Sequence, residues 1–112
     1  MTIRSWDLFL VAPANISSTA IFLSIMARLA GYNPGVVTIQ ATNAHIYEDH
    51  FDQVSELLTR DHFPAPRLVL SDNVKKIERD SDIKGAFERI APTDISMDGY
   101  HSHEAIKAPM AA

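Results

Sequence analysis

The sequence predicts a mixed fold of helices and strands, α+β or α/β, and three observations support this prediction. A long apolar segment over 15–30 has the composition of a buried helix. A second segment over 49–60 spaces its apolar residues as a helix does, and short apolar or β-branched runs lie before, between and after the two. The 112 residues correspond to one domain or to part of one.

The first expected elements are a strand and the long helix. Residues 4–11 are mostly apolar, as in a buried strand. Asn15 or Ser17 can cap the following helix, because a short side-chain oxygen accepts a hydrogen bond from a free backbone N–H. Only Ser24 and Arg28 are polar between residues 20 and 30. We therefore expect this helix to be buried on most sides, by a larger sheet, another chain or both.

The remaining elements are shorter. The β-branched run over 36–41 predicts a strand, and Phe51, Val54 and Leu58 mark the apolar face of the helix over 49–60. The elements expected further along the chain are a strand over 67–70, a helical turn around 83–90 and a last short strand over 95–97.

Composition bears on several classes of function. The formal net charge is −4, whereas a nucleic-acid binder usually carries a basic excess. No apolar run reaches the roughly 18 residues of a membrane span, and the first seven residues lack the apolar core of a signal peptide. We expect a cytoplasmic protein that binds neither nucleic acid nor membrane. The absence of cysteine removes disulfides, thiolate metal sites and a cysteine nucleophile from these residues.

Several polar residues could bind a ligand. Alternation along a strand places His45 and Tyr47 on one face, where they either meet a polar ligand or form a half-buried aromatic pair. Asn15 is either a helix cap or a ligand-binding amide, and Arg4 with Ser5 either grips a phosphate or lies on the surface. Spacing and composition alone favour the structural role in each case.

The five histidines do not predict a metal site. His101 and His103 are two residues apart, and His45 and His50 are five apart. Neither pair has a third ligand at a familiar spacing. No glycine-rich phosphate loop and no GxSxG motif is present either.

Three stretches resemble one known family. They are RSWDLFLVAPANISS over 4–18, AHIYEDHFDQ over 44–53 and GYHSHEAIKAPMA over 99–111. In order and at compatible spacing, they are similar to RSxDxxLGxPxNIxSY, DAHIYxNHxDQ and GYxPHPxIKAPMAV of the thymidylate synthase family. The resemblance implies an α+β fold in which residues 1–112 form the C-terminal part of a thymidylate synthase-type domain, a mixed sheet packed against long buried helices.

The resemblance also implies how a pyrimidine nucleoside monophosphate would bind. Arg4 and Ser5 would hold the 5′-phosphate, and Asp7 would lie at the end of the pocket where the base meets the folate. Asn15 would pair its amide with N3–H and O4 of uracil, which matches the donor and acceptor of a carboxamide.

The sugar and the co-substrate would involve other residues. His45 and Tyr47 would hold the 3′-hydroxyl of the deoxyribose. The co-substrate implied is 5,10-methylenetetrahydrofolate, beside Asp7 and Val11, with the tail that ends at Ala112 closing over it. The resemblance implies no metal.

Some positions depart from the family pattern. Val11 stands where the family has Gly, Thr19 where it usually has Tyr, and Asp49 where it has Asn. Thr42-Asn43 replaces Gly-Asp, and 101–102 differ around the tail proline. Because Val11 and Thr19 would lie near the folate, these changes leave open whether the product is methylated or hydroxymethylated.

The family's nucleophilic cysteine lies upstream of the Arg-Ser pair, so no catalytic nucleophile is expected in this chain. We expect a separate N-terminal-half polypeptide to supply it, in a homodimer-type assembly of the completed enzyme. The reaction implied is transfer of a one-carbon unit to C5 of dUMP. The alternatives are 5-hydroxymethylation of dUMP or of dCMP/CMP, and a non-catalytic orphan fragment that binds nucleotide or mediates dimerisation.

Overall fold

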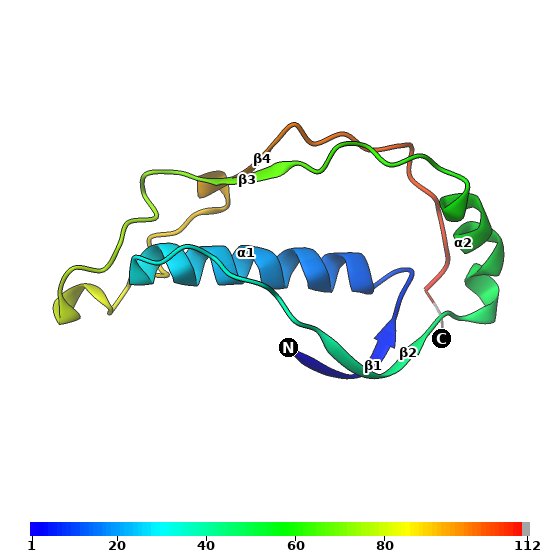
Figure 1. Ribbon diagram of the computed structural model, residues 1–112, viewed down its shortest axis with the longest axis horizontal. Helices are drawn as coiled ribbons and strands as arrows, with labels where there is room; N and C mark the ends of the chain where they lie inside the picture. The colour runs from blue at the N-terminus through cyan, green and yellow to red at the C-terminus, as the bar shows by residue number, and fades with distance from the viewer. Residues whose placement is uncertain (111–112) are drawn as a thin grey trace. The chain divides into compact units, whose positions relative to one another are not determined.

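The computed structural model describes residues 1–110, and its mixed helix and strand content agrees with the expected fold class (Figure 1). The chain forms two compact units. The first contains residues 1–18, 38–64 and those from 101 onward, and the second contains 19–37 and 65–100. The helices and strands are, in chain order, β1 (Thr2–Asp7), α1 (Ala12–Ala30), β2 (Gln40–His45), α2 (Phe51–Leu58), β3 (Arg67–Leu70) and β4 (Ile95–Asp98).

The first unit is built on a parallel pair of strands, β1 and β2, which lie side by side in Figure 1. The register sets Thr2 against Gln40 and Asp7 against His45. A backbone hydrogen bond of 2.9 Å from the N–H of Leu8 to the carbonyl of His45 continues the ladder by one residue. Parallel strands need a long connection, and here that connection contains α1.

Helix α1 starts three residues earlier than the sequence predicts. It begins at Ala12, and its first turn contains Pro13. Proline is tolerated there because the first backbone N–H groups of a helix have no intrahelical partner. The hydroxyl of Ser17 donates back to the carbonyl of Pro13 at 2.8 Å, so Ser17 is not a cap. The helix ends at Ala30, and the next residue, Gly31, has a φ of +77°, the left-handed conformation that favours glycine.

Both strands of the first unit differ from their predicted bounds. Residues 8–11 form a turn rather than the end of a strand, because the Asp7 carboxylate accepts the backbone N–H groups of Phe9 and Leu10. The second strand is Gln40–His45 instead of 36–41, since pairing with β1 decides which residues are in the sheet. The β-branched run over 36–39 lies before it, outside the ladder.

The helix predicted over 49–60 is shorter. A single 3₁₀ turn (Glu48–His50) leads into α2, which ends at Leu58. After it the backbone N–H groups of Thr59 and Arg60 bond only three residues back, to the carbonyls of Glu56 and Leu57. The last turn is therefore tightened to 3₁₀-type hydrogen bonds, as is common at the C-terminus of an α-helix.

The second unit holds the larger apolar cluster. Strands β3 and β4 pair antiparallel, with Leu70 against Ile95 (Figure 1). The core consists of Ile25, Leu29, Val74 and Ala86. The predicted strand over 67–70 is confirmed, and the last strand extends one residue further, to Asp98. Residues 83–89 form turns, and the nearby helical turn is a 3₁₀ turn at Asp80–Asp82.

Helix α1 is less buried than its composition predicts. Ile25 and Leu29 are 8% and 4% exposed, whereas Ile16 is 48% and Phe22 is 58% exposed. Apolar side chains therefore remain uncovered by the described residues. Among residues 1–110, no helix is both long and apolar enough to cross a membrane.

Candidate functional site

The parallel pair β1–β2 positions the predicted residues of the first unit. Side chains alternate along a strand, and paired residues of neighbouring strands lie on the same face. Ser5 and Asp7 therefore share a face with their partners Asn43 and His45. Arg4 lies on the opposite face of β1. The register thus brings Asp7 beside His45, although they are 38 positions apart in the sequence with α1 between them.

The Asp7 carboxylate organises the turn that precedes α1. Its Oδ1 accepts the N–H of Phe9 at 2.9 Å and that of Leu10 at 3.2 Å. Its Oδ2 has no partner among the residues that the structure describes. Asp7 therefore has a structural role that the sequence did not predict, and it keeps one oxygen that can accept a hydrogen bond from a ligand.

Asn15 lies inside the first turns of α1, not at its cap, so the cap expected from composition is wrong. Its backbone N–H donates to the carbonyl of Val11 at 3.0 Å. Its side-chain Oδ1 accepts the indole N–H of Trp6 at 3.1 Å. Because an indole N–H can only donate, this contact fixes which end of the amide is the oxygen.

His45 and Tyr47 begin a row of aromatic rings at the end of β2. Their ring centroids are 5.0 Å apart with the planes at 90°. The row continues from Tyr47 to His50 at 5.9 Å and from His50 to Phe9 at 5.4 Å. The Nδ1 atom of His45 is buried without a hydrogen-bond partner in the described residues. The pair therefore has the edge-to-face packing of an aromatic contact together with an unused polar atom.

Three further predicted residues are more exposed. Arg4 and Ser5 are exposed, and neither side chain makes a hydrogen bond or ion pair with another of residues 1–110. Val11 is 41% exposed in the turn before α1. Ala112 lies outside the described residues. An arginine without a carboxylate partner on an acidic chain is a candidate anion ligand.

A hollow of about 450 Å³ in the first unit lies at the end of α2 and includes none of the predicted site residues. It is lined by Leu57, Leu58, Arg60, Asp61, His62, Phe63 and His103. The His103 and Phe63 rings pack at 4.5 Å there. No group of three or more His, Asp or Glu side chains within residues 1–110 is arranged to hold a metal ion.

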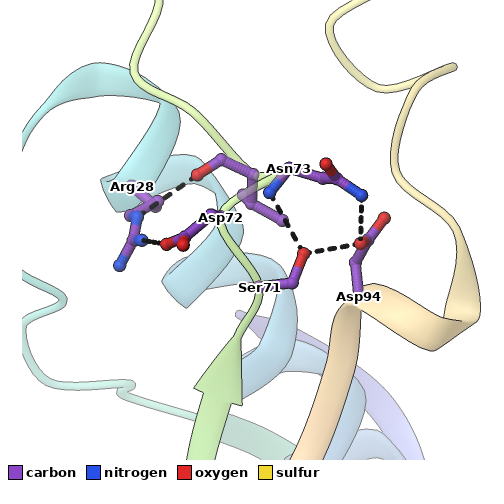
Figure 2. A network of polar contacts seen from close by, with 6 residues as sticks. Arg28, Ser71, Asp72, Asn73 and Asp94 are labelled. Carbon is purple, nitrogen blue, oxygen red and sulfur yellow. Dashed lines mark hydrogen bonds and ion pairs between the residues drawn. The ribbon is translucent and has the colours of Figure 1, made fainter.

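A polar cluster in the second unit closes the end of the β3–β4 pair, as Figure 2 shows. The Asp94 Oδ1 accepts the Ser71 hydroxyl at 2.5 Å and the Asn73 amide at 3.0 Å, and its Oδ2 accepts the Ala91 N–H at 2.9 Å. The Ser71 hydrogen bond, followed by those of Ala91 and Asn73, lowers the pKa of Asp94 below its usual value, against the opposing effect of burial. Every donor is local to the turns, so the cluster is structural.

Two residues near the site were missed by the sequence analysis, Trp6 and His50. Trp6 orients Asn15, and His50 is completely buried. His50 lies within the second family-like stretch, five residues after His45, and a spacing of five residues indicates neither burial nor a contact with the C-terminal segment. Its burial on a short polar segment depends on long-range packing, for which spacing gives no signal.

Comparison with known proteins assigns the family. The thymidylate synthase family model matches residues 1–112. Thymidylate synthase of Pseudomonas syringae pv. tomato is 42% identical over 110 residues, and that of Pseudomonas putida is 40% identical over 110. Each alignment covers 97% of this chain and 34% of the relative, so the chain spans about a third of their length.

The fold agrees with this assignment. The crystal structure of thymidylate synthase from T4 phage superposes with a TM-score of 0.83 at 32% identity, covering 99% of this chain and 40% of that one. The α+β fold class and the resemblance drawn from the three stretches are both confirmed. The chain belongs to the thymidylate synthase family.

Proposed function

We propose that this chain supplies the nucleotide-binding residues of a thymidylate synthase-type enzyme, which transfers a one-carbon unit from methylenetetrahydrofolate to C5 of dUMP. The observation that carries the proposal is the β1–β2 register. It sets Asp7 against His45, while Asn15 is tied to β1 through Trp6. Polar groups from a strand end, a helix start and a second strand thus belong to one compact unit.

Arg4 and Ser5 bind the 5′-phosphate in this proposal. Arg4 lies on the face of β1 opposite Ser5, and its long side chain reaches the phosphate past the free edge of this two-stranded sheet. A guanidinium forms paired, charge-assisted hydrogen bonds with phosphate oxygens, and a hydroxyl adds a neutral donor. Both side chains are exposed and unpaired within residues 1–110, which supports a role toward a ligand.

The base is held by an amide, and the sugar by an imidazole and a phenol. Asn15 recognises uracil, because its amide can accept from N3–H and donate to O4. His45 and Tyr47 hold the 3′-hydroxyl of the deoxyribose. The Nδ1 of His45, buried and without a partner among residues 1–110, supports this role. A buried polar atom without a partner is costly, so it is expected to gain one when the site fills.

Methylenetetrahydrofolate binds beside Asp7 and Val11, under the tail that ends at Ala112. The residues present fit such a molecule. Asp7 offers a carboxylate oxygen that has no partner among residues 1–110 and can accept from ring N–H donors. Val11 offers an exposed apolar side chain in the turn that Asp7 organises. When bound, the folate supplies the one-carbon unit, and this chain's residues orient it and exclude water.

The nucleophile comes from outside these residues. Activation of C5 requires a thiolate to add to C6 of the pyrimidine, and the chain contains no cysteine. We propose that a separate N-terminal-half polypeptide supplies it, that residues 1–112 form the C-terminal part of the domain, and that the completed enzyme is a cytoplasmic homodimer-type assembly. The chain's coverage of 34% of its relatives supports an incomplete site in this segment.

A chimera tests the proposal. The matched segment of the Pseudomonas syringae thymidylate synthase is replaced by this chain, and the chimera is given dUMP and methylenetetrahydrofolate. We expect loss of hydrogen from C5 and formation of dTMP, whereas the same protein without the segment should form none. A folded chimera that neither binds dUMP nor releases the C5 hydrogen would favour the orphan fragment.

The product distinguishes the alternative reaction. Val11 adds bulk near the proposed folate position and is exposed enough to touch a ligand. If this bulk displaces the folate so that water, rather than hydride from the folate, adds to the transferred methylene carbon, the product is a hydroxymethyl nucleotide. That product is heavier than the methylated one by one oxygen atom. Mass analysis of the chimera's product with dUMP, dCMP and CMP separates methylation of dUMP, hydroxymethylation of dUMP and hydroxymethylation of a cytosine nucleotide.

A further inference from the structure

His50 is completely buried, at 0% exposure, and the proposed reaction assigns it no role. It lies in the 3₁₀ turn between β2 and α2, and its backbone N–H donates to the carbonyl of Tyr47 at 3.0 Å. Its Nδ1 has no hydrogen-bond partner within the described part of the chain. A buried histidine with one unused nitrogen needs a physical reason, because polar burial is unfavourable unless it is compensated.

One side of the ring holds the C-terminal segment. The His50 Nε2 lies 2.8 Å from the carbonyl oxygen of Pro109, 59 residues away. Because a carbonyl only accepts, Nε2 carries the hydrogen. Two other contacts of this segment, Arg60 to the Glu104 carbonyl and His103 to the Asp61 carbonyl, are exposed and lie further from the chain end. The His50 contact is partly buried, because the imidazole is fully buried while Pro109 is exposed, and it holds the described residues nearest the chain end.

The faces and edges of the ring contact two other aromatic side chains. Tyr47 meets it at 5.9 Å and 80°, an edge-to-face arrangement, and Phe9 meets it at 5.4 Å and 47°. Tyr47 in turn packs edge-to-face on His45. The ring of His50 therefore restricts where the Tyr47 ring can lie.

We propose that His50 is a positioning residue that couples the C-terminal segment to the ribose end of the site. Its Nε2–H fixes Pro109, and its ring fixes Tyr47. The proposal rests on the proposed function, in which Tyr47 holds the sugar and the tail covers the folate. Since the two contacts use different parts of one side chain, substitutions can separate them.

Two variants of the chimera, which contains the full chain, make this separation. His50→Phe keeps the ring and removes the donor. His50→Gln keeps an amide donor near the Nε2 position and removes the ring. His62→Phe, at an exposed histidine, is the matched control for a histidine-to-phenylalanine change. The readouts are hydrogen–deuterium exchange of the peptide 104–110, the KM for methylenetetrahydrofolate and the Kd for dUMP.

The expected pattern is crossed. His50→Phe should speed exchange in 104–110 and raise the folate KM by about tenfold each, with the dUMP Kd within about twofold; tenfold corresponds to one lost hydrogen bond. His50→Gln should leave the exchange of 104–110 near that of the parent. It should raise the dUMP Kd by about fivefold, which is within the range for loss of one aromatic pair. His62→Phe should change neither.

The proposal is overturned if His50→Phe leaves the exchange of 104–110 unchanged, or if both variants shift all readouts together, as a merely structural role would. Exchange is measured without ligand, so it decides the tail contact even if the unsubstituted chimera fails to bind dUMP. That failure would instead reject the proposed function, and with it the link from Tyr47 to the sugar.

Discussion

At the scale of single residues, the contact between Trp6 and Asn15 decides how the amide meets a ligand. The indole N–H donates to Oδ1 at 3.1 Å, so Trp6 on β1 sets the orientation of a side chain on α1. An amide that is free to flip would read either pattern of donors and acceptors. A fixed amide can discriminate, and this orientation is therefore part of the proposed base recognition.

Replacing Asn15 with Asp should shift base preference from uracil toward cytosine. The change keeps an oxygen for the Trp6 N–H, while the amide donor becomes an acceptor that suits the 4-amino group of cytosine. We expect dUMP affinity to fall by roughly 1–3 kcal/mol relative to dCMP, the cost of a mismatched buried polar contact. Calorimetric titration of both nucleotides into the chimera measures this.

Asn33→Asp is the matched control, because Asn33 is exposed in the segment after α1 and the substitution makes the same change of charge. This control should leave the affinities for dUMP and dCMP unchanged. An unchanged ratio of dUMP to dCMP affinity in the Asn15 variant would show that this side chain does not read the base.

At the scale of elements, the Asp94 cluster of Figure 2 predicts an acid-sensitive junction between β3 and β4. Hydrogen bonds from Ser71, Ala91 and Asn73 lower the pKa of Asp94 in the folded state. The folded protein then binds this proton less readily than the unfolded chain does. The stabilisation is complete above the unfolded pKa of about 4 and is lost as the pH falls through the lowered folded pKa.

Asp94→Asn should remove this part of the acid sensitivity and lower stability at neutral pH. Ser71→Ala, which deletes the hydrogen bond that lowers this pKa most, should do the same to a smaller extent. Melting temperatures of the chimera from neutral pH to below about 4 give the comparison. If the melting temperature falls equally steeply with decreasing pH in the parent and in Asp94→Asn, the cluster is not the cause of the acid sensitivity.

Local sequence predicted some elements better than others for physical reasons. Strand β3 was correct because an apolar run follows two prolines, and the end of α1 was correct because Gly31 takes a left-handed conformation. The start of α1 was missed because Asn15 and Ser17 have the chemistry of caps but bond elsewhere. Strand β2 was displaced because its limits depend on pairing with β1, which the local β-branched run does not encode.

The site residues also differ in how far the sequence could predict them. The predicted substrate residues came from family-like motifs, since spacing alone favoured a structural role for each. Trp6 and His50 could not be found this way, because their contacts reach 9 and 59 residues along the chain. The second role of Asp7, in the turn before α1, is local. It could have been inferred because an aspartate carboxylate commonly accepts the backbone N–H two residues on and so starts a turn.

At the scale of the whole molecule, exposed apolar side chains predict that the isolated 112-residue chain associates. Ile16, Phe22, Phe51 and Phe87 are each about half exposed. Large exposed apolar surface drives association or marks an interface. Light scattering of the chain alone should show concentration-dependent oligomers, and the chimera should show much less. A sharp, reversible, monomeric melting transition of the isolated chain would contradict this expectation.

The central claim is that this chain carries the nucleotide-binding half of the site, and Arg4 tests it most directly. Arg4 is exposed and unpaired within residues 1–110, so its loss should not disturb folding. Arg67, an exposed arginine on β3 with Asp98 as its partner, is the matched control. His45 provides the contrast, because the sugar hydroxyl is present in nucleoside and nucleotide alike.

The deciding measurement is calorimetric titration of dUMP and deoxyuridine into the chimera and its three alanine variants. Arg4→Ala should weaken dUMP binding by roughly 1.5–3 kcal/mol, the range for a hydrogen bond to a charged group. It should leave the binding of deoxyuridine unchanged. His45→Ala should weaken both ligands, and Arg67→Ala should weaken neither. If Arg4→Ala binds dUMP as tightly as the parent does, the phosphate site is not built on this strand and the account is contradicted.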